Sequence, residues 1–328
     1  MTQQDTYKAE LLNPTMYKFF TGVYNDFRHK AIRDYQFELE PLEYNEFITA
    51  IDNNLLKCIS LLENDIPTGF LAYTCSISEG IELNMVHFLG NDDVNTKFKV
   101  LMNKFLELTE QERKRKVICY PMLGIQSNYI SEISKFGFKF IGQAVLRYKM
   151  DNPQSERILD NVKLDSLPPQ YKITYWNDEY KNQVIELIYD SFKDTADALF
   201  DTRFRSIQGV EDIINKITED IYGEFLPQNT SILLCDNHVC GIAFANLTTK
   251  EIANIPLVAI SKRHRGKNFS KNLLQRTVRM IVDSAKLKEN ECKEINVTTE
   301  TNNYKALKMY RRVGFKEDYC YPQAYTEV

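Results

Sequence analysis

Apolar residues recur with helical spacing in some segments of the second half of the chain and fill short uninterrupted runs in others. In residues 178–192, Val184, Leu187, Ile188 and Phe192 share one helical face, and Asp178 is the expected N-cap. The apolar runs 231–235 and 240–246 are separated by a polar turn at 236–239, which predicts a β-hairpin. The full predicted order is a helix at 178–192, a helix at 210–222, strands at 231–235, 240–246 and 252–260, a helix from about 269 to 286, a strand at 294–299, a helix at 303–313 and a final strand from Phe315.

The first half of the chain repeats this order of elements. Its pattern predicts helices at 15–29 and 42–53, strands at 56–62, 68–77 and 81–89, a helix at 95–108, a strand at 116–121, a helix at 127–136 and a last strand after Gly137-Phe138. The Gly-Phe pairs that begin at Gly137 and Gly314 lie 177 residues apart. A repeat of this length indicates duplicated domains rather than a solenoid. We therefore expect a domain at 1–150, a polar linker at 151–170 and a domain at 171–328.

Length and composition agree with two globular domains. The 328 residues are 43% hydrophobic and 26% charged, which is typical of folded proteins and excludes disorder as the main state. The net charge of −4 gives no global electrostatic basis for binding nucleic acid or an anionic membrane. No apolar run approaches the ~20 residues that span a bilayer, and the start does not read as a secretory signal.

Cysteine and histidine usage points to a reduced compartment without a metal centre. The seven cysteines are scattered and form no CxxC pair, so we expect free thiols and a cytoplasmic location. None of the four histidines has metal-ligand spacing to another histidine or to a cysteine. We therefore expect no metal.

The first segment with candidate chemistry is 256–274, where a predicted strand ends, a basic loop follows and a helix begins near Phe269. The first turn of a helix offers unpaired N–H groups and a positive dipole end, which favour an anion. Gly266 allows close backbone approach, and Asn268 tolerates a left-handed conformation. The surrounding cations are Lys262, Arg263, Arg265, Lys267 and Lys271. These features favour a pyrophosphate site, and the alternative is an ordinary turn with solvated basic residues.

The second such segment is 297–315. Asn303, Ala306 and Tyr310 occupy one face of the predicted helix. Asn303 would either cap this helix or bind a ligand amide. Tyr310 would either reach a ligand or be one of the many core aromatics in a chain with 19 Tyr and 19 Phe.

These two segments, in this order, resemble motifs of the GNAT acetyltransferase superfamily. The acyl-CoA signature of that family is Gln/Arg-x-x-Gly-x-Gly/Ala, followed downstream by Asn-x-x-Ala-x-x-x-Tyr-x-x-x-Gly-Phe. The downstream motif is complete here, as Asn303, Ala306, Tyr310, Gly314 and Phe315. The upstream motif keeps Arg265 but has Asn268 and Ser270 at the two small positions. The resemblance covers 171–328 closely and 14–150 by the order of elements only.

The resemblance implies an α/β (α+β) fold class, with two GNAT-like domains that each have a mixed, mostly antiparallel sheet flanked by helices. It also implies an acyl-CoA-dependent N-acyltransferase, with acetyl-CoA as cosubstrate and a small-molecule or peptide amine as acceptor. Tyr310 would be the general acid that protonates the departing thiolate. The residues implied in coenzyme A binding are Val258, Ala259, Ile260, Arg265, Gly266, Lys267, Asn268, Phe269, Ser270, Asn303 and Ala306. Backbone donors near Ile260 would stabilise the oxyanion.

The general base stays open, because the position where some relatives have a glutamate is Asn254 here. Glu251, Glu300 or a chain of water molecules are the alternatives. The first domain lacks the chemistry: Asp92 and Asp93 stand where the pyrophosphate loop would lie, and Ile133 stands at the tyrosine position. We therefore expect a degenerate first domain and catalysis in the second.

Two alternative functions remain at this point. One is a non-catalytic acyl-CoA-binding or regulatory module, and the other is an aminoacyl-tRNA-dependent peptidyltransferase, whose family also pairs two GNAT-like domains. The leading interpretation expects no nucleic-acid partner, no membrane, and a monomer or homodimer.

Overall fold

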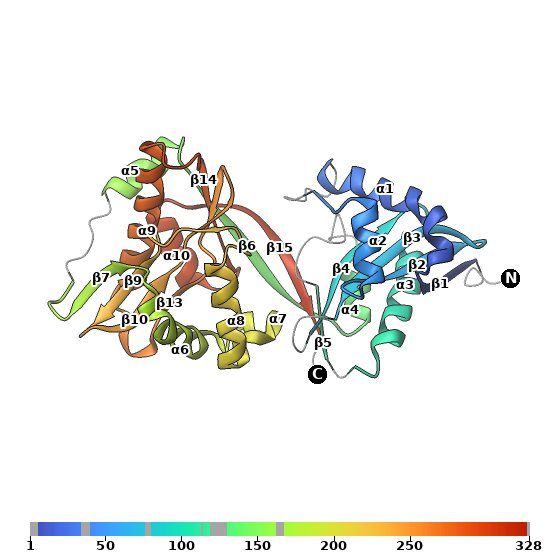
Figure 1. Ribbon diagram of the computed structural model, residues 1–328, viewed down its shortest axis with the longest axis horizontal. Coiled ribbons are helices and arrows are strands. Elements are labelled where there is room, and N and C mark those ends of the chain that lie inside the picture. The colour runs from blue at the N-terminus through green and yellow to red at the C-terminus, as the bar shows by residue number, and fades with distance from the viewer. Residues whose placement is uncertain are drawn as a thin grey trace. The chain divides into compact units, whose positions relative to one another are not determined.

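The computed structural model describes residues 6–33, 40–75, 80–112, 114–118, 130–161 and 167–326. Two compact units make up the chain, one of Met1–Ile141 with Tyr321–Val328 and one of Gly142–Cys320 (Figure 1). The strands β6 (Lys139–Lys149) and β15 (Lys316–Tyr325) therefore contribute residues to both units. The boundary lies inside β6 rather than after it, because Gln143–Lys149 pair with a strand of the second unit.

The first unit is a sheet in the order β1–β2–β3–β4–β5, completed by the end of β15. All neighbours are antiparallel except β4 and β5. Asn64 and Asp65 both have positive φ, as the predicted hairpin turn requires. The elements of this unit are β1 (Tyr7–Leu11), α1 (Tyr17–Arg33), α2 (Tyr44–Asp52), β2 (Lys57–Glu63), β3 (Ile66–Thr74), β4 (Gly80–Phe88), α3 (Val94–Thr109), β5 (Arg115–Ile118) and α4 (Ile130–Lys135).

Helices cover both faces of this sheet, because side chains alternate along each strand. In β3, Phe70 and Ala72 pack into the core formed with α1 and α2. Their neighbours Leu71 and Tyr73 pack into the opposite core, which α3 and α4 complete. The apolar faces predicted for these helices are therefore the faces that pack against the sheet.

The second unit contains two sheets. The larger has the order β15–β6–β14–β12–β11–β8, and the smaller has the order β13–β10–β9–β7. Its elements are α5 (Pro153–Asn161), β7 (Tyr171–Tyr175), α6 (Lys181–Phe192), α7 (Asp197–Phe200), α8 (Ile207–Thr218), β8 (Glu224–Phe225), β9 (Ser231–Cys235), β10 (His238–Ala243), β11 (Asn246–Thr249), β12 (Ile252–Asn254), β13 (Val258–Ile260), α9 (Phe269–Lys286), β14 (Glu294–Glu300) and α10 (Tyr304–Val313).

The predicted strand 252–260 is divided in the structure, and this division positions the site. Its first part, β12, pairs in parallel with β14, and Ile255 N–H still donates to Asn296 C=O at 3.0 Å. Its second part, β13, pairs antiparallel with β10 instead. Pro256 stands at the change of partner, where it has no N–H to continue the ladder. Because β13 has left β14, the two strands diverge.

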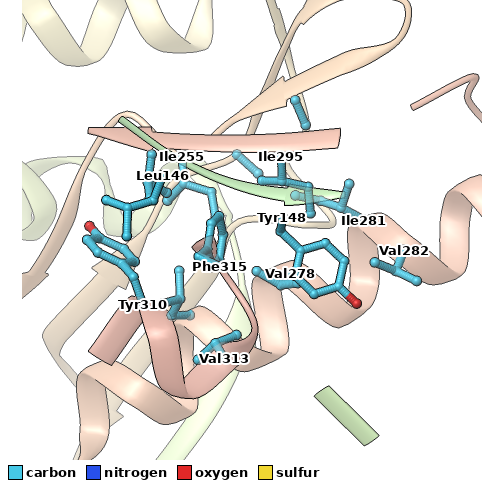
Figure 2. Close-up of a cluster of buried hydrophobic side chains, with 14 of the residues drawn as sticks. Leu146, Tyr148, Ile255, Val278, Ile281, Val282, Ile295, Tyr310, Val313 and Phe315 are labelled. Atoms are coloured by element: carbon cyan, nitrogen blue, oxygen red, sulfur yellow. The ribbon is translucent and has the colours of Figure 1, made fainter. Parts of the chain in front are cut away.

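One apolar core of the second unit joins β6, β14, α9 and α10 (Figure 2). Leu146 and Tyr148 from β6, Ile295 from β14 and Val278 from α9 meet there. The ring of Tyr310 belongs to the same cluster and lies 5.7 Å, centroid to centroid, from that of Phe315. The walls of the site are therefore held by buried packing.

Several elements differ from the sequence prediction. The helix α5 occupies part of the segment assigned to a linker, and Ser155 Oγ donates to Gly314 C=O at 2.9 Å, so this helix packs on the end of α10. The short elements β1, β7, α7 and β8 were not predicted. The N-cap at the start of the 178–192 segment is Asn177 rather than Asp178. The predictions for 76–77, 119–121, 127–129 and 162–166 lie outside the described residues.

Candidate active site

A cavity of about 590 Å³ opens in the second unit where β13 and β14 diverge. Its walls come from β13, the loop before α9, the end of β14, α10 and the start of α7. It is within the size range of small-molecule sites. Of the twelve site residues predicted from the sequence, eleven line it: Val258, Ala259, Ile260, Arg265, Gly266, Asn268, Phe269, Ser270, Asn303, Ala306 and Tyr310.

Strand β13 presents an open edge to this cavity, because it is the edge strand of its sheet. On the β10 side, Phe244 N–H donates to Leu257 C=O at 3.0 Å and Ser261 N–H donates to Cys240 C=O at 2.9 Å. Backbone groups alternate in direction along an antiparallel strand, so those of Val258 and Ile260 point away from β10. One of them is used, since Arg265 Nε donates to Ile260 C=O at 2.9 Å. The others can pair with an extended ligand.

The loop between β13 and α9 has the conformation that an anion site needs. Gly266 has φ +82°, and Asn268, the residue before α9, is left-handed with φ 61° and ψ 11°. Asn268, which was expected to tolerate a left-handed conformation, adopts one. The first intrahelical bond of α9 runs from Asn272 N–H to Asn268 C=O, so the N–H groups of Phe269 and Ser270 precede it. A methyl group at Gly266 would meet nothing within 4 Å, which leaves room beside the loop.

The side chain of Lys267 is the exception among the predicted residues, because it does not line the cavity. Its ammonium lies 3.3 Å from the Tyr171 hydroxyl and 5.6 Å from the centre of the Tyr171 ring. The same ring packs at 4.5 Å from Phe269. Lys267 and Tyr171 therefore contact each other beside the loop, and the ammonium of Lys267 is directed to Tyr171.

Asn303 caps α10, since its Oδ1 accepts from Ala306 N–H at 3.2 Å. This confirms the capping interpretation, and Asn303 also lines the cavity. Gly314 ends the helix with φ +109°, and Phe315 N–H donates back to Tyr310 C=O at 3.2 Å. The two ends of α10 thus fix the orientation of Tyr310.

Tyr310 is both a core aromatic and a cavity residue. Only 6% of its surface is exposed, and among the described residues its hydroxyl has no hydrogen-bond partner. Burial raises the pKa of Tyr310, and the nearby Asp197 carboxylate raises this pKa further. The phenol therefore stays protonated at neutral pH and can donate a proton to an atom in the cavity.

Two carboxylates line the same cavity. Glu300 is the last residue of β14, and Asp197 is the first residue of α7. Burial raises the pKa of Glu300, and the charge of Asp197 raises it further. Desolvation also raises the pKa of Asp197, although this residue is exposed at the surface of the cavity. Glu251, the other candidate base, forms an ion pair with Lys293 and does not line the cavity.

Sequence reasoning missed Asp197, because α7 has only four residues and no motif marks it. It missed three cavity cations as well: Lys305, Lys308 and Arg312 lie on one face of α10 and line the cavity. Their spacing of three and four residues was readable, but an exposed basic helix face is usually only solvated.

The first unit repeats the backbone of the loop without its chemistry. Asp93 precedes α3 in a left-handed conformation with φ 52°, as Asn268 precedes α9. The residues there are the exposed Asp92 and Asp93, and Ile133 on α4 is buried in the core. A carboxylate pair repels an anion, and an isoleucine has no proton to donate.

The comparisons with known proteins agree with this architecture. Residues 192–315 match the model of the acetyltransferase (GNAT) family. A GCN5-related N-acetyltransferase from Sphaerobacter thermophilus is similar over 98% of this chain and 96% of its own, at 10% identity and a TM-score of 0.61. A tandem GNAT protein from the clavulanic acid biosynthesis pathway is similar over 98% of both chains, at 11% identity and a TM-score of 0.59.

A third structure, the glucosamine N-acetyltransferase region of a fungal multi-domain β-N-acetylglucosaminidase, is similar over 98% of this chain and 38% of its own, at 11% identity and a TM-score of 0.64. The curated proteins include no match to this sequence. The chain therefore has the fold of tandem GNAT proteins, and its residues 192–315 match the GNAT family model.

Two features are absent from the residues that the structure describes. No group of three His, Cys, Asp or Glu side chains there is arranged to hold a metal ion. No helix in the same residues combines the length and the apolar character needed to cross a bilayer.

Proposed function

We propose that this protein is an acyl-CoA-dependent N-acyltransferase that transfers an acetyl group from acetyl-CoA to an amine, with its active site in the second unit. The observation that carries the proposal is the divergence of β13 from β14 into a cavity that Tyr310 lines. An open strand edge, a left-handed loop before a helix and an unpaired phenol meet around this one cavity. The GNAT-family match over 192–315 covers the same residues.

The described residues fit coenzyme A in two places. The free backbone groups of Val258 and Ile260 match the amides of a pantetheine arm, which would extend the sheet by one strand. The N–H groups of Phe269 and Ser270, with the guanidinium of Arg265 nearby, match a pyrophosphate. The cations of α10 add positive charge to the wall that such an anion would face.

Each step of the transfer has a candidate residue. The thioester supplies the acyl group and a sulfur leaving group. Glu300 accepts the proton that the amine must lose, and its raised pKa makes it a better proton acceptor than an ordinary carboxylate. Backbone N–H groups at the β13 edge stabilise negative charge that develops on the carbonyl oxygen. Tyr310 donates a proton to the sulfur.

Charge reversal in the loop tests the binding site. Arg265→Glu places a negative charge beside the loop N–H groups, and we expect it to weaken coenzyme A binding by more than about tenfold in calorimetry. The matched control is Lys262→Glu, because Lys262 is in the same loop but outside the cavity and is exposed. Equal affinity of the wild type and folded Arg265→Glu protein would refute this placement.

The structure also informs the alternative of a non-catalytic acyl-CoA-binding module. Such a module needs the loop and the strand edge, but it needs neither an unpaired phenol nor a carboxylate with a raised pKa in the same cavity. Release of thiol from acetyl-CoA in the presence of amines separates the two functions.

A further inference from the structure

The cavity contains one acidic group that has no role in the proposed transfer. Asp197 stands at the start of α7, and it lines the same cavity as Glu300 and Tyr310. Its Oδ2 accepts from Thr195 Oγ1 at 3.1 Å, which fixes the orientation of the carboxylate. Asp197 is the only charged group that affects the pKa of Glu300 and that of Tyr310 within the described residues. All three acidic groups line this one cavity.

Neither carboxylate is neutralised by the protein. Among the described residues, Asp197 and Glu300 form no ion pair, although the same cavity has five cations in its walls: Arg265, Lys271, Lys305, Lys308 and Arg312. Two like charges that line one cavity are unfavourable, because each opposes ionisation of the other. A cationic ligand between them would remove this repulsion.

Tyr310 is an independent indication of a ligand at this end of the cavity. Its side chain is more than nine-tenths buried, and its hydroxyl has no partner among the described residues. Tyr310 lines the cavity, so a polar ligand there can pair with its hydroxyl. The hydroxyl and the two carboxylates are therefore complementary to a polar ligand rather than to an apolar one.

The cations of the cavity come from other elements than Asp197 and Glu300, and they suit another part of the bound molecules. Arg265 and Lys271 flank the first turn of α9, and the other three lie along α10. This charge suits the phosphates of coenzyme A. An acceptor that carries a carboxylate and binds near Asp197 and Glu300 would be repelled by their negative charges.

We infer that the acceptor is an amine with a second positive charge, of the diamine class, bound between Asp197 and Glu300. This inference rests on the proposed function of the same cavity. One ammonium group loses its proton to Glu300 and attacks, and the other remains charged and pairs with Asp197. Asp197 is thus a specificity-determining residue, and it does not take part in the chemistry.

The transfer is balanced without a further reactant. The C–N bond forms, the C–S bond breaks, and the attacking nitrogen gives up protons as it becomes an amide. The ammonium nitrogen gives up two protons: Glu300 receives the first and later releases it to solvent, and the second passes through solvent to Tyr310, where it replaces the proton that Tyr310 supplies to the sulfur. The products are an N-acetyl amine with one remaining positive charge and a free thiol.

Three four-carbon amines test the inference, because they differ only in the group at the far end. Butane-1,4-diamine carries a second cation, butylamine carries none, and 4-aminobutyrate carries an anion. We expect kcat/KM for thiol release from acetyl-CoA to be at least about tenfold higher with the diamine than with butylamine, and lowest with 4-aminobutyrate.

Asp197→Asn should reduce the preference for the diamine over butylamine towards unity, through KM of the diamine. Asp194→Asn is the matched control, because Asp194 is exposed in the same segment, outside the cavity. Calorimetry with the diamine and coenzyme A gives a second readout that does not need turnover. Equal kcat/KM for the three amines, an unchanged preference in Asp197→Asn, or no diamine binding would each overturn the inference. Failure to bind coenzyme A would overturn the proposed function instead.

Discussion

Removing one oxygen atom from Tyr310 separates its two structural roles. Tyr310→Phe keeps the ring that packs against Phe315 and deletes only the hydroxyl. That hydroxyl has no hydrogen-bond partner among the described residues, so the substitution breaks no bond within them. We therefore expect the free energy of unfolding to change by less than about 0.5 kcal/mol.

The expected loss of rate follows from the pKa of the phenol. A positioned general acid contributes roughly 10²–10⁴-fold, and the contribution is largest when its pKa lies near the working pH. Burial and Asp197 raise the pKa of Tyr310, which makes it a weaker proton donor. We therefore expect Tyr310→Phe to lower kcat by about 10²-fold, at the lower end of this range, with coenzyme A affinity nearly unchanged.

Turnover and melting temperature should be measured on the same preparation. Tyr304→Phe is the matched control, because Tyr304 is on the same helix, is 76% exposed and does not line the cavity. Unimpaired turnover in Tyr310→Phe would remove this tyrosine from the mechanism. A large loss of stability with normal turnover would instead assign it to the core alone.

Two further predictions concern the first unit. His87 is buried, and burial lowers its pKa from 6.5 to about 4 despite the bond of 2.9 Å between Nε2 and Asp26 Oδ2. As the pH falls, the unfolded chain takes up this proton before the folded chain does. The stability associated with neutral His87 is therefore fully present above pH 6.5, and roughly 3 kcal/mol of it is lost as the pH falls towards 4. Denaturant titrations at several pH values should show this loss in the wild type and less of it in His87→Gln, and identical pH profiles would refute it. Deleting residues 321–328 should expose β5, since Ala324 pairs with Ile118 and Thr326 N–H donates to Lys116 C=O at 2.9 Å. Hydrogen exchange at Val117 and Ile118 should then accelerate by at least about tenfold, and unchanged exchange would contradict this.

The periodic parts of the fold were predictable because their burial depends on local spacing. The apolar stripe of 269–286 and the Gly314 stop are both in the structure, and the left-handed Asn268 could be inferred from its residue type. The elements that escaped prediction are short or acquire their partners from distant sequence. The strand β7 pairs with β9 some 60 residues later, and β15 joins β5 from about 200 residues away. Long-range pairing leaves no periodic signal in a single sequence.

The candidate site shows the same limit. The motif residues could be identified by their spacing, since Asn303, Ala306 and Tyr310 lie on one face of the helix α10 and its N-cap. The break at Pro256 was present in the sequence, but its consequence depends on which strands lie on either side. Asp197 belongs to the site only because a four-residue helix places it against the cavity. The direction of the Lys267 side chain was set by Tyr171, almost a hundred residues earlier in the chain.

The most direct test of the central claim is to measure thiol release and acetylated amine together. The wild-type protein should be incubated with acetyl-CoA and a panel of a monoamine, a diamine, an amino acid and a lysine peptide. We predict that at least one amine gains one acetyl group for each thiol released, and that Tyr310→Phe slows both equally. Coenzyme A binding without any acetylated amine would contradict catalysis and favour a binding module. Retained tRNA without coenzyme A binding would instead favour an aminoacyl-tRNA-dependent transferase.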